Sequence, residues 1–416
     1  MAVLRRGRGI LEIAGIEIGH AGHVDAEAGA LTGTTMFVVP VGTVGGVDVR
    51  GGGPASHETE LMAPGTLQSG PDAIVLSGGS AYGLVTASGV QAALAVAGRG
   101  FPAPGLPGVT VPLVPAASIF DLGRGGAPCL PPTLETGGAA FAARTAGPEA
   151  VVRGSVGGGL GAWTGRGLLR GGLGSAVIDT DTGHRVAAIV VANPMGTVIS
   201  AAGRLHAAEV LAGYGIELPA DATPELAERF AAVAAAAEQA AGGAGGDAAA
   251  DRAGPGSAPG DAPGAGAPGA GSLNTTIAAV VTDAQLDAAQ VHRLAQSAHA
   301  GLARAIHPSH TLFDGDTVFA LATGATAVGS AGTPAGDAQA GAGHAQAGAG
   351  HAQASTTADP MVLAQLSIAA ADALSAAIVD AVISAADYAD GPPTPASPPP
   401  LQAVCPQLAA AWNAVD

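Results

Sequence analysis

The sequence offers a hydroxyl nucleophile at one abrupt boundary, where a tract of glycine, alanine and proline meets the β-branched run "NTTIAAVV". A threonine hydroxyl becomes a good nucleophile when a base removes its proton. The α-amine of the same residue can be that base once the preceding peptide bond is cut. Such an amine has a pKa of about 7.7 to 8.0, which suits general-base work near neutral pH. Cleavage between Asn274 and Thr275 would create this arrangement.

The composition of residues 241–272 supports a cut at this boundary. The tract has no periodicity and almost no large apolar side chain, so we expect it to be a disordered linker that lets the upstream chain leave. Two other interpretations fit the same residues. Asn274 and the threonines after it form an N-glycosylation acceptor, which we disfavour because no signal peptide is recognisable. A turn followed by an ordinary edge strand also fits.

Acidic and imidazole side chains gather downstream in "HPSHTLFDGDTVFA". Asp314 and Asp316 are two residues apart and lead into an apolar run, so a strand would direct both carboxylates to one face. They could hold the ammonium and hydroxyl of an N-terminal threonine or bind a cation, although Asp-Gly-Asp is also a common turn. Ligands for an EF-hand are absent. We expect His307 and His310 to be loop histidines, and we expect no metal and no cofactor.

Two glycine-rich segments each resemble a known functional motif only in part. "GSVGGGLGAWTG", from Gly154, lacks a Walker lysine and a G-x-G-x-x-G register, which favours close backbone packing or an anion-binding nest over a nucleotide site. "SGGSAYGL" predicts a turn from a strand into a helix. It lacks the glycine that a serine-hydrolase elbow has two residues after Ser80. Backbone amides at this helix start, or the phenol of Tyr82, could still line a site.

Alternating strands and helices must position these residues. Short apolar runs from Met36, Ala73 and Val186 predict buried strands, as do the runs after Thr275 and Asp316. Helices are predicted at 84–97, at 205–211, from Thr223, and at 360–386 after an Asp-Pro cap. One more helix has a single apolar face made by Val291, Leu294, Ala295, Ala298, Leu302 and Ala305. The order predicts one α/β domain with two insertions, at 241–272 and 324–357, and a proline-rich tail at 391–416.

Charge and hydropathy exclude several classes of protein. The 416 residues carry 16 basic side chains, all arginine, against 33 acidic ones, and a net charge of -17 disfavours nucleic acid. Residues 73–98 form a stretch that is long and apolar enough to be considered as a transmembrane helix. Their Ser-Gly-Gly-Ser centre predicts a strand, a turn and a helix instead. Cys129 and Cys405 do not suggest a disulfide framework. We expect a cytoplasmic protein with no membrane partner.

Seven segments in order resemble one family: "LEIAGIEIGHAGH", "VDVRGGGPASHETELM", "LSGGSAYGL", "GSVGGGLGAWTGRG", "VVANPMG", "NTTIAAVVTDA" and "HTLFDGDTVFA". This is the family of L-aminopeptidase/D-esterases and β-peptidyl aminopeptidases, self-processing N-terminal nucleophile hydrolases that include the nylon-oligomer hydrolases. The similarity covers about residues 10–215 and 273–323. It implies a four-layer αββα sandwich, commonly assembled as a homotetramer. It also implies a precursor that cuts itself into a larger subunit, 1–274, and a smaller one, 275–416.

The resemblance also implies roles for individual residues. Thr275 would be the nucleophile, Asn193 in "VVANPMG" would donate its side-chain amide to an oxyanion, and Asp314 and Asp316 would orient the threonine. Tyr82 would line the pocket. Arg166 stands where the nylon-oligomer hydrolases carry lysine; arginine keeps the positive charge but cannot carry a proton. The threonine preceded by asparagine looks closest to the nylon-oligomer hydrolases.

These observations lead to one principal functional hypothesis. We expect an amidase that cleaves itself at Asn274 and then hydrolyses linear amides such as 6-aminohexanoate oligomers. Amides or esters of short D-, L- or β-amino acids are the alternative substrates. A non-catalytic scaffold with the same fold is the rival from another class, and a metal-dependent hydrolase that uses the acidic and histidine residues after Ile306 is a weaker one.

Overall fold

The computed structural model describes residues 1–67, 70–243, 274–328, 359–388, 394 and 397–415. The predicted linker at 241–272 lies outside these residues except for its start, where α5 (Pro224–Gly243) ends. The predicted loop at 324–357 is described only at 324–328, where β15 (Thr317–Thr326) ends.

Two sheets form the centre of the described structure. The larger has the order β1 (Val3–Arg5), β12 (Gly172–Asp179), β13 (Arg185–Ala192), β14 (Ile277–Ala284), β15 and β4 (Val44–Val49). Its neighbours are antiparallel except for β14 and β15, which are parallel. The second sheet has the order β2 (Glu17–Asp25), β3 (Ala30–Val38), β6 (Ala73–Ser77), β9 (Ala116–Ser118) and β5 (Ser56–His57).

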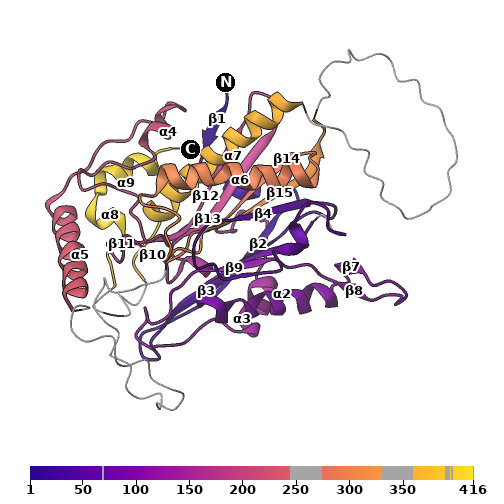
Figure 1. Ribbon diagram of the computed structural model, residues 1–416, viewed down its shortest axis with the longest axis horizontal. Coiled ribbons are helices and arrows are strands. Elements are labelled where there is room, and N and C mark those ends of the chain that lie inside the picture. Colours follow the sequence, from indigo (N-terminus) through magenta and orange to yellow (C-terminus); the bar gives the residue numbers. More distant parts are fainter. Residues whose placement is uncertain (68–69, 244–273, 329–358, 389–393, 395–396, 416) are drawn as a thin grey trace.

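Helices cover the outer face of each sheet, which gives four layers (Figure 1). α6 (Ala288–Ala305) and α7 (Pro360–Ile383) pack on the larger sheet, and α2 (Val85–Val96) and α3 (Leu134–Ala142) pack on the smaller one. Strand alternation divides the core: in β14, Ala278 and Val280 face the helices, whereas Ile277 and Val281 lie between the sheets. The predicted αββα sandwich is confirmed.

Capping residues account for the helix starts. Asp287 accepts a hydrogen bond from the backbone of Gln290 and begins α6 with a capping box, and Asp359 caps α7. The predicted apolar face of α6 is buried along its length. α7 ends at Ile383, three residues before the predicted end. The helix predicted at 205–211 is wrong at its start: α4 is Ala208–Ala212, because Leu205 pairs with Ile199 in a β-bridge.

Two apolar segments raise the question of a membrane span. Residues 73–98 form β6, the short helix α1 (Ser80–Gly83) and α2, as predicted. α7 is long enough to cross a bilayer and has a mean hydropathy of 1.9 in its most apolar window. That window is 89% buried inside the protein, against α6 and the larger sheet. α7 therefore serves as a core helix.

The end of the chain packs on the same core as α7. The proline-rich tail contains α8 (Leu401–Val404) and α9 (Pro406–Asn413), and Trp412 is fully buried. Asp221 accepts hydrogen bonds from the first backbone amides of α9. The short elements are β7 (Phe101–Pro102), β8 (Thr110–Val111), β10 (Trp163–Thr164), β11 (Leu169–Arg170) and the 3-10 helices Gly9–Glu12, Glu60–Met62 and Gly157–Gly159.

Candidate active site

The Asn274–Thr275 bond lies just before β14, beside the segment that leads into β15. Asn274 and Asp314 form a parallel β-bridge, and the Asn274 N–H donates to the Phe313 carbonyl at 3.0 Å. On the other side, the Thr317 N–H donates to the Thr276 carbonyl at 3.1 Å. The side chains of Asn274 and Thr275 are buried. The bond that the sequence singled out is therefore held rigidly inside the fold.

Three groups contact the atoms around this bond. The Thr275 hydroxyl donates to the Asn274 carbonyl oxygen at 2.5 Å, and the Gly315 N–H donates to the same oxygen at 3.1 Å. The Thr275 N–H donates to the Asn193 carbonyl at 2.9 Å. Donors aimed at a carbonyl oxygen stabilise the negative charge that develops there when a nucleophile attacks the carbonyl carbon. The Gly315 amide is such a donor, and no motif in the sequence predicts it.

Gly315 occupies a position with no room for a side chain. A Cβ atom there would lie 2.7 Å from the Thr275 hydroxyl oxygen, 2.8 Å from the Gly53 carbonyl and 3.1 Å from the Cα of Pro54. Contacts this short force neighbouring atoms to move. Glycine is therefore required between the two aspartates because the backbone at this position lies close to the Thr275 hydroxyl, and not only because a turn forms there.

The two aspartates hold the segments on either side of Thr275. Asp316 accepts from the Thr276 N–H at 2.8 Å, and its other oxygen accepts from His310 Nδ1 at 2.8 Å. Asp314 accepts from the N–H of Met195, two residues after Asn193, at 3.1 Å. Burial, and then the charge of Asp316, raise the pKa of Asp314. Both carboxylates bind backbone beside the threonine, and neither has a hydrogen bond to Thr275 itself among the described contacts.

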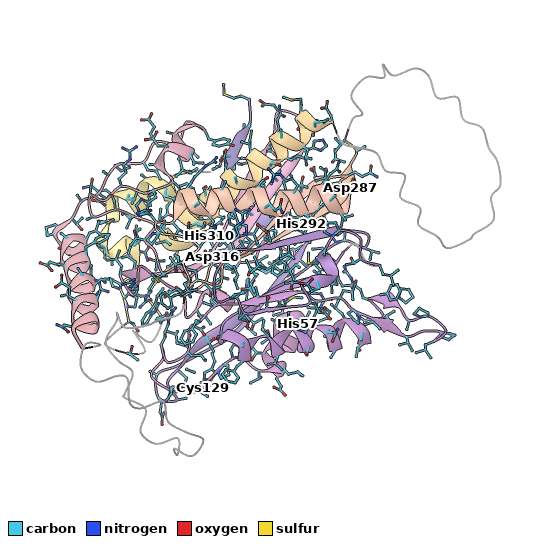
Figure 2. The ribbon with its side chains drawn as sticks, viewed as in Figure 1. His57, Cys129, Asp287, His292, His310 and Asp316 are labelled. Atoms are coloured by element: carbon cyan, nitrogen blue, oxygen red, sulfur yellow. The ribbon has the colours of Figure 1, made fainter. Side chains whose placement is uncertain are left out.

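His310 has a more specific place than the loop position expected for it. Its ring and backbone amide both hydrogen-bond to Asp316, which is labelled near it in Figure 2, and its ring lies edge-on to that of His299, with centroids 4.9 Å apart. Burial lowers the pKa of His299 to about 4, so this neighbour is neutral at pH 7. In the described ranges, no group of three or more His, Cys, Asp and Glu side chains is arranged to hold a metal ion.

Asn193 accepts a hydrogen bond from the threonine through its backbone carbonyl, whereas its side chain has hydrogen bonds to other groups. Its Oδ1 atom accepts hydrogen bonds from the Arg124 guanidinium and, at 3.0 Å, from the Trp163 N–H. Its Nδ2 atom donates to the Phe120 carbonyl at 3.3 Å. In this uncleaved chain the amide predicted to bind an oxyanion is therefore not on the Asn274 carbonyl. Arg124, which the sequence analysis did not single out, is the cation that contacts it.

Comparison with known proteins identifies the family. The model of peptidase family S58 matches residues 9–392. The chain belongs to peptidase family S58. It is 39% identical over 326 residues to an uncharacterized aminopeptidase of Mycobacterium leprae, covering 76% of this chain and 78% of the relative. It is 27% identical over 328 residues to the 6-aminohexanoate-oligomer endohydrolase of a Kocuria species, covering 74% and 73%.

A solved structure agrees with the fold of this S58 peptidase. The L-aminopeptidase D-Ala-esterase/amidase of Ochrobactrum anthropi, a variant of the Ntn hydrolase fold, superposes with a TM-score of 0.58 at 18% identity. The match covers 95% of this chain and 91% of that one. The resemblance to the L-aminopeptidase and nylon-hydrolase family is confirmed. The nylon-oligomer hydrolase shares less identity with this chain than the mycobacterial aminopeptidase does.

Two predicted site residues of the S58 peptidase lie apart from the hydrogen bonds around Thr275. Arg166 is half-buried at the turn between β10 and β11, with a left-handed backbone (φ 58°). The adjacent Gly165 N–H donates to the carbonyls of Pro194 and Gly196, yet the Arg166 side chain has no hydrogen bond or ion pair with any described residue. Tyr82 lies on α1 and is 64% exposed, without a hydrogen bond to Thr275 or Asn193.

The glycine-rich segment after Gly154 fills the space between the sheets. Cβ atoms on Gly158 and Gly159 would lie 2.5 Å from the Leu76 carbonyl oxygen and 2.4 Å from the Leu173 nitrogen. These glycines bring β6 and β12 close to the same short helix, so the close-packing interpretation accounts for them.

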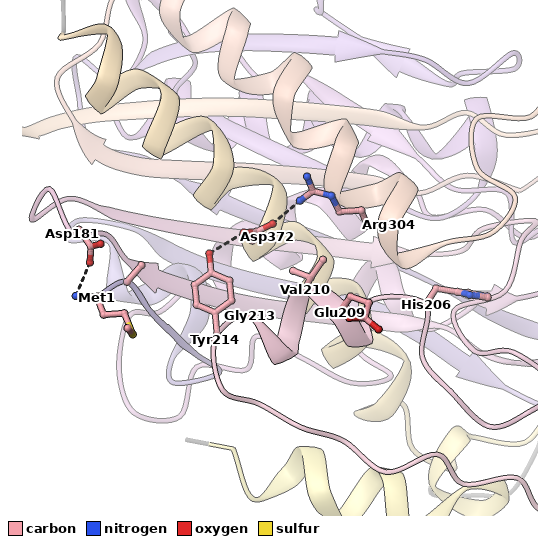
Figure 3. A pocket seen from close by; sticks show the side chains of 10 residues that line it. Met1, Asp181, His206, Glu209, Val210, Gly213, Tyr214, Arg304 and Asp372 are labelled. Atoms are coloured by element: carbon pink, nitrogen blue, oxygen red, sulfur yellow. Dashed lines mark hydrogen bonds and ion pairs between the residues drawn. The ribbon is translucent and has the colours of Figure 1, made fainter.

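A surface cavity of about 760 Å³ is separate from all of these residues (Figure 3). Asp372 at its wall accepts from the Tyr214 hydroxyl at 2.9 Å and pairs with Arg304 at 2.7 Å. None of the predicted site residues lines it. The cavity therefore gives no support for chemistry at Thr275.

Proposed function

We propose that this S58 peptidase is a self-cleaving amide hydrolase whose nucleophile is the N-terminal threonine freed at Thr275. The observation that carries the proposal is the convergence of the Thr275 hydroxyl and the Gly315 N–H on the carbonyl oxygen of Asn274. A nucleophile and a polarising donor at one carbonyl are the parts that an acyl transfer needs.

Self-cleavage would proceed by an N-to-O acyl shift. The Thr275 hydroxyl oxygen attacks the Asn274 carbonyl carbon, an O–C bond forms, and the C–N bond breaks as the hydroxyl proton moves to the nitrogen. Water then hydrolyses the ester. The products are the carboxylate of Asn274, which ends the larger subunit 1–274, and a free amine and hydroxyl on Thr275, which begins the smaller subunit 275–416.

Turnover would use the same hydroxyl on a substrate amide. The Thr275 amine takes the hydroxyl proton and later gives it to the leaving amine, because its pKa lies near the working pH. Asn193 would donate its side-chain amide to the oxyanion. Asp314 and Asp316 would keep the flanking backbone in place. No metal or cofactor enters these steps.

Substitution of the nucleophile tests the first step. Thr275→Val keeps the shape of the side chain but removes its hydroxyl, and it should leave a single chain. Thr275→Ser keeps a hydroxyl and should still split, as seen on a denaturing gel. Cleavage of the valine variant at the same bond would refute the acyl shift.

The substrate class is a separate part of the proposal. The 39% identity to an aminopeptidase favours short amino-acid amides, while the 27% identity to a 6-aminohexanoate-oligomer endohydrolase keeps nylon oligomers as the second candidate. We expect purified, cleaved protein to release nitroaniline from an amino-acid nitroanilide faster than 6-aminohexanoate from its oligomers. The reverse order would assign the nylon activity. Cleaved protein that hydrolyses neither would contradict an amidase of either kind.

A further inference from the structure

The orientation of the Asn193 side-chain amide is fixed by its neighbours. Two donors, the Arg124 guanidinium and the Trp163 N–H, both point at one terminal atom of the side chain. A donor cannot bond to the NH₂ end of an amide, so this atom must be the oxygen. The NH₂ end then lies on the other side, where one of its two hydrogens goes to the Phe120 carbonyl. Its second hydrogen has no acceptor among the described residues and remains for another one.

Arg124 is held where it can impose this orientation. It is buried, its Nη1 atom also donates to the Gly161 carbonyl at 2.5 Å, and its guanidinium lies 4.8 Å from the centre of the Trp163 ring. Burial lowers the pKa of Arg124 to about 10, so the side chain remains charged at pH 7.

Asp121 supplies the compensating charge for this buried guanidinium. It is buried, and it is itself held by the Gly79 N–H at 2.6 Å and the Thr32 hydroxyl at 2.7 Å. A Cβ atom on Gly161 would lie 2.5 Å from an Asp121 carboxylate oxygen, so the cluster is tightly packed. The charge of Asp121 raises the pKa of Arg124 against the effect of burial, without a direct hydrogen bond or ion pair between the two side chains among the described residues. The tight packing around both groups favours one position of the guanidinium.

We propose that Arg124 is a positioning residue for turnover, which holds the Asn193 amide with an N–H directed to the substrate oxyanion. The inference rests on the proposed function, in which Asn193 stabilises that oxyanion. Arg124, and not Arg166, is the cation that contacts Asn193 in the described structure. The inference also separates the two reactions: self-cleavage uses the Gly315 N–H and the Asn193 backbone carbonyl, whereas turnover uses the Asn193 side chain.

The chain provides a matched control for a purely structural effect. Arg170 is also buried, donates to the backbone carbonyls of Pro398 and Ala386, and lies 4.0 Å from the centre of the Tyr388 ring. It has no hydrogen bond to Asn193. Arg124→Met and Arg170→Met therefore remove similar packing and similar hydrogen bonds, but only the first frees the Asn193 amide.

The test measures both reactions in each variant. We expect Arg124→Met to split into its two chains and then to show a kcat lowered by at least about 10-fold with KM changed by less than about threefold, because only a transition-state contact is lost. Arg170→Met should keep its kcat. If Arg124→Met does not yield folded protein, Arg124→Lys, which keeps the charge but not the planar fork, is measured in its place.

A double-mutant cycle distinguishes positioning from general loss of structure. In an Asn193→Ala background, Arg124→Lys should change kcat by less than about threefold, because the amide it orients is gone. Equal kcat for the Arg124 and Arg170 variants, or additive losses in the cycle, would overturn the inference. Failure of the wild-type chain to split would instead overturn the proposed function, so the two failures are distinguishable.

Discussion

At the scale of single residues, the absence of a side chain at position 315 is as important as the proposed nucleophile beside it. The Gly315 N–H donates to the Asn274 carbonyl, and a Cβ atom on this residue would point at the Thr275 hydroxyl. Gly315→Ala would place a methyl group 2.7 Å from that hydroxyl oxygen if nothing moved. We expect Thr275 to be displaced and self-cleavage to slow by about 100-fold, the typical effect of a shift of about 1 Å at a reacting centre.

The control for this prediction is Gly138→Ala in α3. A Cβ atom at Gly138 meets nothing within 4 Å, and its helical backbone accepts alanine readily. Both variants are followed by the rate at which the two fragments appear. An unchanged rate in Gly315→Ala would show that the hydroxyl does not occupy the observed position when it reacts.

The same scale shows which site residues a sequence can predict. Thr275 and the aspartate pair could be predicted because the signals for them are local. The composition changes abruptly just before the threonine, and the two aspartates are two residues apart. Arg124 could not, because it reaches Asn193 across 69 residues of chain through a tertiary contact. His310 is near the aspartates in sequence, but the sequence does not reveal its left-handed backbone (φ 54°) or the bond of its ring to Asp316.

At the scale of elements, one buried carboxylate joins segments that are distant in sequence. Asp380 on α7 accepts hydrogen bonds from Arg6, Arg153, the Ser175 backbone on β12 and the Trp412 indole on α9. Its side chain is completely buried. The carboxylate therefore ties the beginning and the end of the chain to the core helix.

Asp380→Asn should destabilise the protein strongly. It leaves two partly buried arginines without their counter-charge, and removing one partner of a buried ion pair costs about 3 to 5 kcal/mol. Glu209→Gln is the control, because Glu209 and its partner Arg204 are both exposed and exposed pairs contribute about 0 to 1 kcal/mol. Urea unfolding of both variants in a Thr275→Ala chain gives the comparison. Equal midpoints would mean that Asp380 does not hold these elements together.

The sequence predicts whether a segment is a helix or a strand better than it predicts where that element begins and ends. β14 and β15 were predictable from continuous apolar runs, and α6 from one apolar face. The start of α4 was not, because a bridge between Leu205 and Ile199 takes the residues that periodicity assigned to the helix. The packing of the proline-rich end on α7 was also not predictable, because it depends on long-range bonds to Asp221 and Asp380.

At the scale of the whole molecule, the sandwich explains why a cut could be made at this bond. β14 lies in the middle of the larger sheet, between β13 and β15, so it would stay fixed after cleavage at its start. The four-layer architecture itself was predictable only through resemblance to a family. Periodicity alone indicated an α/β domain, since it does not fix which strands share a sheet.

The mass of the purified wild-type protein tests the central claim most directly. Dividing 39.4 kDa in proportion to the residues before and after Asn274 gives chains of about 26 and about 13 kDa. We predict that intact-mass spectrometry finds these two chains and that N-terminal sequencing of the smaller one begins Thr-Thr-Ile. A single 39.4 kDa chain, or a smaller fragment that begins at another residue, would contradict the account.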